Sequence, residues 1–310
     1  GDGYLGWQTI TYSDALAWPE SGDDNVGSGR IGPRLVRARA NTEVTGHVYE
    51  IKFVSEDSFQ VIDANTLEFV QTEQPYRSGE PIDAIPGIEV TISGQPVKGD
   101  TFTVRTQAVK PMEWIVHDGT ITYPIALFVE QVRTNPDLPE RYTEKADTYE
   151  ELLLNNFLKK WDGSWVEIPP DMGAYRFEPR VCNPYLRSFP PEQFPDVTRI
   201  LPHNQYLALA RTFLVMADVV DGPRTDDLRQ RGAKMCRFFK SKLRETDDAY
   251  TFAYSDTVED VSDEADDFSH GGLSVSGAVE AYERGVVFDD LDMQRFANTL
   301  LTQIWNGSLQ

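Results

Sequence analysis

The sequence predicts a mainly α-helical protein, an α/α toroid that is complete or partial, with a small antiparallel β domain inserted into it. Two patterns and one spatial argument support this fold class. After Pro111, apolar side chains recur at every third or fourth position in six segments, which pair as three helical hairpins. Before Pro111, side chains alternate with a period of two, which is typical of half-buried strands. Successive hairpins with large loops on one side are expected of a ring of paired helices.

The first 40 residues are predicted to be loop-rich and to pack on the helical domain. They contain many glycines, four arginines at positions 30, 34, 37 and 39, and the aromatic residues Tyr4, Trp7, Tyr12 and Trp18. Aromatic platforms and a basic patch beside a cleft would give this segment a binding function. Ordinary surface arginines on a segment held to the core are the commoner case, and we favour that interpretation.

Residues 41–108 are predicted to form the inserted β domain. Its strands are indicated by five runs separated by turn residues: HVYEIKFV, SFQVID, LEFVQT, IEVTISG and DTFTVRT. The segment Tyr76–Val104 contains the spacing G-x-x-V-x-I-x-G-x-P-x-x-G-D-x-F-x-V. It resembles the small β domain of flagellar hook-associated proteins, and the resemblance covers residues 45–107. This resemblance implies a surface-displayed module and no catalytic chemistry.

Residues 109–310 are predicted to form the helical domain that contains an active cleft. The clearest segment runs from Ile200 to Val220, where Pro202 belongs to the first turn. The turn Asp221-Gly222-Pro223 and Gly285 punctuate the helices. The irregular stretch 162–199 contains seven prolines, is too long for a simple connection, and is expected to cover a functional surface. The predicted helices are Ile121–Val132, Glu140–Lys160, His203–Val220, Asp226–Arg244, Gly272–Arg284 and Asp289–Trp305.

Three histidines occupy equivalent places in this pattern. His117, His203 and His270 precede the first, third and fifth predicted helices. If the inner helices of a toroid run parallel, their N-termini share one rim, so the three histidines would face one cleft. A single histidine at a helix start is more often a cap or a partner of a carbonyl group, but three in one register favour a chemical role. The fourth histidine, His47, lies in the β domain.

The runs PHNQYLALA, FAYSD and DDFSHGG resemble segments of α/α-toroid polysaccharide lyases, alginate-lyase-like ones in particular. The resemblance covers residues 1–20 and 109–310, and it implies cleavage of a uronic-acid polymer by β-elimination. It implies His203, Asn204 and Tyr254 as catalytic groups, although alginate lyases usually carry the Asn–His pair in a different local order. The histidine register adds His117 and His270 to this set.

Each step of an elimination has a candidate residue. Asn204, near a helix N-terminus, can stabilise the charge that develops on a substrate carboxylate. A neutral His203 or the phenolate of Tyr254 can remove the proton, and a tyrosine can protonate the leaving oxygen. An arginine can hold the carboxylate by a bidentate pair. The residues expected to bind substrate are Tyr206, Arg176, Arg180, Arg199, Asp118, Asp266 and Trp165.

A net charge of −21 argues against nucleic acid or an anionic membrane surface as the main partner, because the field of the protein repels both. An acidic polysaccharide would need a cleft made locally positive by arginines. No apolar run reaches the length of a membrane span and no signal peptide is visible, so we expect a mature secreted, periplasmic or cell-surface protein. No cofactor is expected, and a bound divalent metal is left open. Cys182 and Cys236 either pair or remain buried thiols.

Three alternatives remain open at this stage. A glycoside hydrolase on the same fold would use two carboxylates such as Asp118 and Asp266. A metal centre would use the three histidines of the register with an aspartate, because imidazole suits zinc and other transition metals. A non-catalytic glycan-binding or surface-structural protein would use the β insert to contact protein or glycan, and would leave the histidine register as coincidence.

Overall fold

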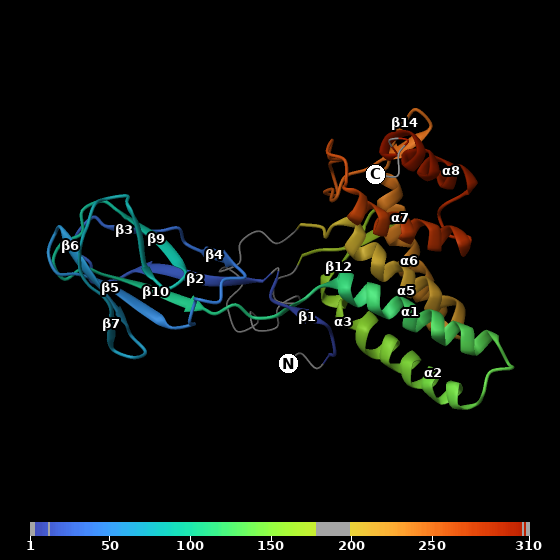
Figure 1. The fold of residues 1–310 in the computed structure, drawn as a ribbon, viewed down its shortest axis with the longest axis horizontal. Coiled ribbons are helices and arrows are strands. Elements are labelled where there is room, and N and C mark those ends of the chain that lie inside the picture. Colours follow the sequence, from blue (N-terminus) through green and yellow to red (C-terminus); the bar gives the residue numbers. More distant parts are fainter. Residues whose placement is uncertain (1–3, 12, 178–198, 306, 308–310) are drawn as a thin grey trace. The chain divides into compact units, whose positions relative to one another are not determined.

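The computed structural model describes residues 4–11, 13–177, 199–305 and 307, and the chain divides into two compact units (Figure 1). One unit, Gln8–Met112, is built of strands. The other, Gly1–Trp7 with Glu113–Gln310, is mostly helical. We call them the β unit and the helical unit. The prediction of a mainly α toroid is wrong, because sheets carry the whole core of the first unit.

The β unit contains two antiparallel sheets. The six-stranded sheet has the order β4 (Val36–Arg39), β2 (Asp14–Ser21), β10 (Thr101–Gln107), β5 (Val48–Phe53), β6 (Ser58–Asp63) and β7 (Glu68–Pro75). The three-stranded sheet has the order β3 (Arg30–Gly32), β9 (Ile88–Ser93) and β8 (Pro81–Ile85). Two short strands, β1 (Gln8–Thr9) and β11 (Met112–Glu113), pair separately.

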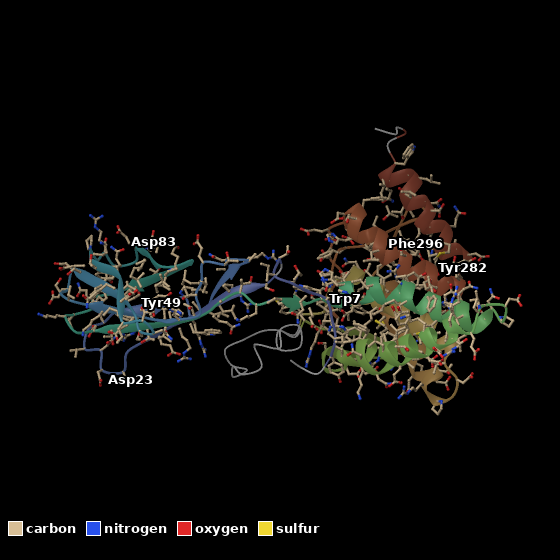
Figure 2. All side chains as sticks on the ribbon, turned by 60° about the horizontal axis from the view of Figure 1, so that its bottom comes forward. Trp7, Asp23, Tyr49, Asp83, Tyr282 and Phe296 are labelled. Atoms are coloured by element: carbon tan, nitrogen blue, oxygen red, sulfur yellow. The ribbon has the colours of Figure 1, made fainter. Side chains whose placement is uncertain are left out.

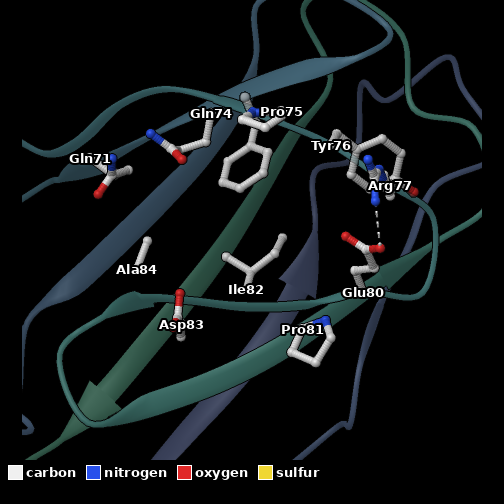
Figure 3. A pocket seen from close by; sticks show the side chains of 11 residues that line it. Gln71, Gln74, Pro75, Tyr76, Arg77, Glu80, Pro81, Ile82, Asp83 and Ala84 are labelled. Atoms are coloured by element: carbon white, nitrogen blue, oxygen red, sulfur yellow. Dashed lines mark hydrogen bonds and ion pairs between the residues drawn. The ribbon is translucent and has the colours of Figure 1, made fainter.

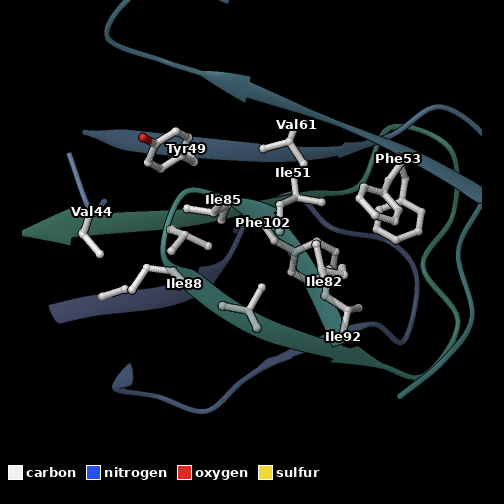
Figure 4. Packing of buried hydrophobic residues seen from close by; sticks show 14 of the residues in the cluster. Val44, Tyr49, Ile51, Phe53, Val61, Ile82, Ile85, Ile88, Ile92 and Phe102 are labelled. Atoms are coloured by element: carbon white, nitrogen blue, oxygen red, sulfur yellow. The ribbon is translucent and has the colours of Figure 1, made fainter. Parts of the chain in front are cut away.

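One hydrophobic core lies between the inner faces of these sheets (Figure 4). In β9 the side chains of Ile88, Val90 and Ile92 are buried, and the residues between them are not. In this strand the alternation read in the sequence therefore gives one buried face. Phe102 of β10 packs edge-on against Phe53 of β5, with ring centroids 5.9 Å apart. The strand runs of the β segment thus meet as a sandwich.

The prediction that residues 1–40 pack on the helical domain is wrong for most of that segment. Strand β2 pairs with β10 over six residues, so that Trp18 lies opposite Arg105. Ala15, Leu16 and Ala17 are buried with Trp18. Only the first few residues belong to the helical unit, where Trp7 stacks on Phe157 with centroids 4.9 Å apart (Figure 2). Pairing between strands that are distant in sequence, such as Phe102 with Ser21, overrides the loop-like composition.

The helical unit is organised around α5 (His203–Val219). Every residue of α5 from His203 to Ala217 is buried, because α1, α6 and α7 all pack against it. Two short hairpins add to this unit. Its helices are α1 (Ile115–Thr134), α2 (Arg141–Leu152) continued by η1 (Leu153–Phe157) and α3 (Leu158–Lys160), α6 (Pro223–Ser241), α7 (Phe268–Glu283), and α8 (Asp290–Asn298) continued by η5 (Thr299–Ile304). The hairpins are β12 (Trp165–Ile168) with β13 (Met172–Tyr175), and β14 (Arg244–Thr246) with β15 (Ala249–Thr251).

A glycine on each of the three neighbouring helices permits this close packing. A Cβ atom at Gly119 of α1 would lie 2.4 Å from the backbone nitrogen of Leu209. At Gly277 of α7 and Gly232 of α6, a Cβ would meet the side chains of Leu207 and Leu214 at 2.9 Å and 2.7 Å. Helix α5 is therefore enclosed by neighbours, whereas an inner helix of a toroid lines an open centre.

Among the described residues, none of the helices combines the length and apolar character that crossing a membrane requires.

Candidate functional site

His203 is a buried structural residue. Its Nε2 lies 2.7 Å from Oδ2 of Asp256, its Nδ1 is bonded to the hydroxyl of Tyr206, and the ring is fully buried. Burial acts to raise the pKa of Asp256, but the hydrogen bonds from His203 and the backbone of Ser262 hold it below its usual range. With both ring nitrogens engaged inside the core, His203 has neither a free lone pair nor a free proton for a substrate.

Asn204 and Tyr206 are also enclosed. Burial raises the pKa of Tyr206 well above the ordinary value of a phenol, so its hydroxyl stays protonated. Asn204 is buried, and its Oδ1 has no hydrogen-bond partner among the described residues. The first turn of α5 therefore holds polar side chains that solvent does not reach. This burial argues against the catalytic role predicted for Asn204 and the substrate-binding role predicted for Tyr206.

The other two histidines lie apart from this buried pair. His270 is partly exposed, its Nδ1 is bonded to the Asp267 carboxylate, and its ring centroid lies 4.7 Å from that of Tyr254. His117 is half-buried in α1, and burial lowers its pKa. No hydrogen bond or ring contact within the described part of the chain joins the side chains of His117, His203 and His270. The predicted convergence of the three histidines is wrong, because the inner rim of a toroid is not formed.

Asp118 is the acceptor of a buried ion pair. Its Oδ2 receives hydrogen bonds from Nζ of Lys160 at 2.8 Å and from Nε1 of Trp161 at 2.9 Å. Lys160 also pairs with the buried Glu113. Burial raises the pKa of Asp118 despite the lysine. Asp118 is thus enclosed and engaged by Lys160 and Trp161, which leaves it unsuited to be one of the two substrate-facing carboxylates of a glycoside hydrolase.

The residues predicted to hold a substrate are scattered or already engaged. Arg176 is half-buried in a bridge to Ile200, and Arg199 is exposed. The guanidinium of Arg231 covers the ring of Trp165 at 4.8 Å, so this ring offers no open platform for a sugar. Arg180 and Cys182 lie outside the described residues. Cys236 is buried, and burial raises the pKa of its thiol to about 12.

Asp266, Asp267 and His270 form the group of potential metal ligands found in the described ranges, with ligand atoms within 4.8 Å of one another. Asp267 has another role, because its carboxylate caps α7 by accepting hydrogen bonds from the backbone N–H groups of Ser269 and His270. His117 and His203 do not join this group. The capping geometry accounts for the cluster without an ion.

A broad apolar groove lies between α7 and the helix formed by α8 and η5. Its volume is about 580 Å³. Phe268, Val275 and Val279 come from α7, and Leu300 and Ile304 come from the opposite wall. We call it the α7–α8 groove. The sequence did not predict this groove. The apolar spacing of both segments is visible, but such spacing is taken to indicate a face that other residues cover.

The β unit has a smaller and more polar hollow between β7 and β8, of about 150 Å³ (Figure 3). Tyr76 and Ile82 lie beside it, and Arg77 and Glu80 form an exposed ion pair at its end, 3.4 Å apart. Its size is below that of ordinary ligand pockets. The α7–α8 groove is therefore the stronger candidate for a functional surface.

Asp266 lies in that groove and supplies a test of its electrostatics. Burial, and then the neighbouring charge of Asp267, raise its pKa to about 6. A carboxyl group whose folded pKa exceeds its unfolded pKa binds its proton more tightly in the native state, so stability falls as the pH rises from about 4 to about 6. We expect Asp266→Asn to raise the melting temperature near neutral pH and to leave it nearly unchanged near pH 4, as measured by thermal denaturation.

Glu264→Gln is the matched control, because Glu264 is an exposed carboxylate of the same loop. It should leave the melting temperature nearly constant over this range. If Asp266→Asn lowered the melting temperature near neutral pH, the charged form of Asp266 would be stabilised by the fold and the description above would be wrong.

No protein-family model matches the sequence, and no curated protein matches it either. Similar solved structures include two crystal forms of FlgL from Xanthomonas campestris. Each is 22% identical, with alignments covering 49% of this chain and 44% or 43% of FlgL, at TM-scores of 0.26 and 0.25. Another is the flagellar junction protein FlgL from Legionella pneumophila, 14% identical over 34% of this chain and 37% of that one, with a TM-score of 0.24. The alignments thus span less than half of each relative.

The prediction of a polysaccharide lyase is wrong, as is that of an enzyme. His203, predicted to be the general base, and Asn204, predicted to stabilise developing charge, are enclosed in the core.

Proposed function

We propose that this protein is a non-catalytic structural protein that acts by binding other proteins outside the cell or at its surface. The observation that carries the proposal is that, in the helical unit, polar pairs are buried whereas an apolar groove is open. Two of its pairs suited to acid–base chemistry, His203 with Asp256 and Lys160 with Asp118, are buried in the core. The α7–α8 groove is mostly apolar, and so it is suited to binding apolar side chains.

Two further features agree with this proposal. The β unit carries the glycine and proline spacing of a surface-displayed hook-type module, from Gly87 to Val104. A junction role, as named for the Legionella protein, is a role of protein binding. The net charge of −21 favours solubility outside the cell and disfavours a polyanionic glycan as the partner.

A panel of uronate polymers tests the non-catalytic part of the proposal. We expect no gain of the near-ultraviolet absorbance of an elimination product and no new reducing ends above a heat-denatured control. The variant His203→Gln should lower the melting temperature by several degrees, because it leaves the buried Asp256 carboxylate without its histidine partner.

His270→Gln is the control for that variant, because the contact between His270 and Asp267 is exposed and contributes little to stability. The proposal would be overturned if the wild type cleaved a polymer and His203→Gln lost that activity with an unchanged melting temperature. That pattern would mark a chemical role for His203.

A further inference from the structure

Helix α7 has two apolar faces, and the described residues cover only one of them. Gly277 faces α5, where an added Cβ would lie 2.9 Å from Cβ of Leu207. The other face presents Phe268, Val275 and Val279 to the α7–α8 groove. Phe268 is 68% exposed, and a Cβ added at Gly272 on this face would meet nothing within 4 Å. The second face of α7 therefore lacks the packing that its composition calls for.

The opposite wall of the groove repeats the same spacing. Along α8 and η5, the positions three, four, seven and eleven residues after Met293 are Phe296, Ala297, Leu300 and Ile304. Leu300 is 46% exposed and Ile304 is 50% exposed. Tyr250 and Phe252 also line the groove. Two helical walls with side chains at matching intervals leave a channel into which the ridge of a third helix fits.

The charges of the groove have one sign. Asp266 and Asp267 are the only charged residues that line it within the described part of the chain. Oδ2 of Asp266 is buried and has no hydrogen-bond partner among the described residues. The adjacent loop adds the exposed carboxylates of Glu259 and Glu264. A buried carboxylate oxygen without a donor is costly, and an incoming lysine or arginine would supply the missing donor.

We propose that the α7–α8 groove binds an amphipathic helix of a partner protein, with apolar anchors toward α7 and η5 and a basic residue toward Asp266. This inference rests on the proposed function and specifies its partner. A second copy of this chain is disfavoured as the occupant, because it carries the same charge of −21. An uncharged apolar ligand would leave Asp266 unpaired.

A model peptide of about five helical turns tests the proposal. It carries leucines on one face and lysines on the other, and the comparison peptide keeps the leucines but replaces every lysine with glutamate. Binding to the full chain is followed by fluorescence anisotropy, and helix formation by circular dichroism. We expect the basic peptide to bind at least about tenfold more tightly than the acidic one and to become helical on binding.

Two protein variants separate the groove from general attraction to an acidic protein. Leu300→Lys and Leu301→Lys add the same charge at adjacent positions, but Leu300 lines the groove and Leu301, 62% exposed, does not. Leu300→Lys should weaken binding by about tenfold or more, whereas Leu301→Lys should change it by less than about twofold. Asp266→Asn should reduce the preference for the basic peptide and retain binding through the apolar face.

Equal effects of the two leucine variants would overturn the proposal, and so would equal affinity for both peptides. Sedimentation of the free protein provides one more outcome against it. If the wild type were a dimer that Leu300→Lys dissociates, the groove would belong to a second copy. Each of these results leaves the non-catalytic part of the proposed function standing, because the polymer assay and the His203→Gln variant test that part separately.

Discussion

Replacing Lys160 with methionine is expected to lower the free energy of unfolding of the helical unit by about 3–5 kcal/mol, because it leaves buried carboxylates without their cation. Asp118 and Glu113 both pair with Nζ of Lys160, and all three side chains are at most 3% exposed. Methionine has a similar length and no charge. Denaturant unfolding followed by helical circular dichroism measures the change.

The neighbouring residue provides the control for that variant. Lys159 has the same side chain but is exposed, so Lys159→Met should change the free energy of unfolding by less than about 0.5 kcal/mol. Adding Asp118→Asn to Lys160→Met should restore part of the loss, because an amide carries no charge into the core. Equal costs for the two lysine variants would show that Lys160 does not neutralise these carboxylates.

The variant Gly119→Ala is expected to destabilise the helical unit by about 3 kcal/mol, because the added methyl group has no space between α1 and α5. It would lie 2.4 Å from the backbone nitrogen of Leu209 and 2.5 Å from the carbonyl carbon of Ala208. Backbone atoms cannot turn aside as a flexible side chain does, so the two helices must separate. The same unfolding measurement applies.

Gly272→Ala is the matched control, because Gly272 is also helical and an added Cβ there meets nothing within 4 Å. It should stabilise the protein by about 0.5–1 kcal/mol, the usual difference between alanine and glycine inside a helix. If Gly119→Ala left the free energy of unfolding unchanged while Gly272→Ala raised it, α1 and α5 would be packed less closely than described.

The buried pairs explain why a catalytic site was predicted at the start of α5, where the polar side chains are enclosed in the core. Histidine, asparagine, tyrosine and aspartate gather around the start of α5, and the same residue types in a cleft would suit an elimination. Their chemistry depends on water and substrate reaching them. Asp256, which engages Nε2 of His203, is 53 residues away in sequence, so the local motif gave no sign that the ring was occupied.

The sequence by itself determined much of the secondary structure. The period of two placed β5, β6, β9 and β10, and the period of three to four placed α5, α6 and α7, each within a few residues of its observed ends. These patterns are local, because a helix or strand repeats within one or two turns and its buried face must carry apolar side chains. The spacing from Gly87 to Val104 likewise indicated a hook-type β module from neighbouring residues alone.

Only the tertiary structure decided which polar groups are engaged and which apolar faces stay open. Lys160 reaches Asp118 across 42 residues of sequence, and β10 recruits β2, whose composition had predicted a loop. The open second face of α7 depends on what packs beside it and not on α7 itself. The burial, partners and pKa of a side chain depend on residues that come from distant segments. The local periodicity of a sequence does not indicate which distant segments pack together.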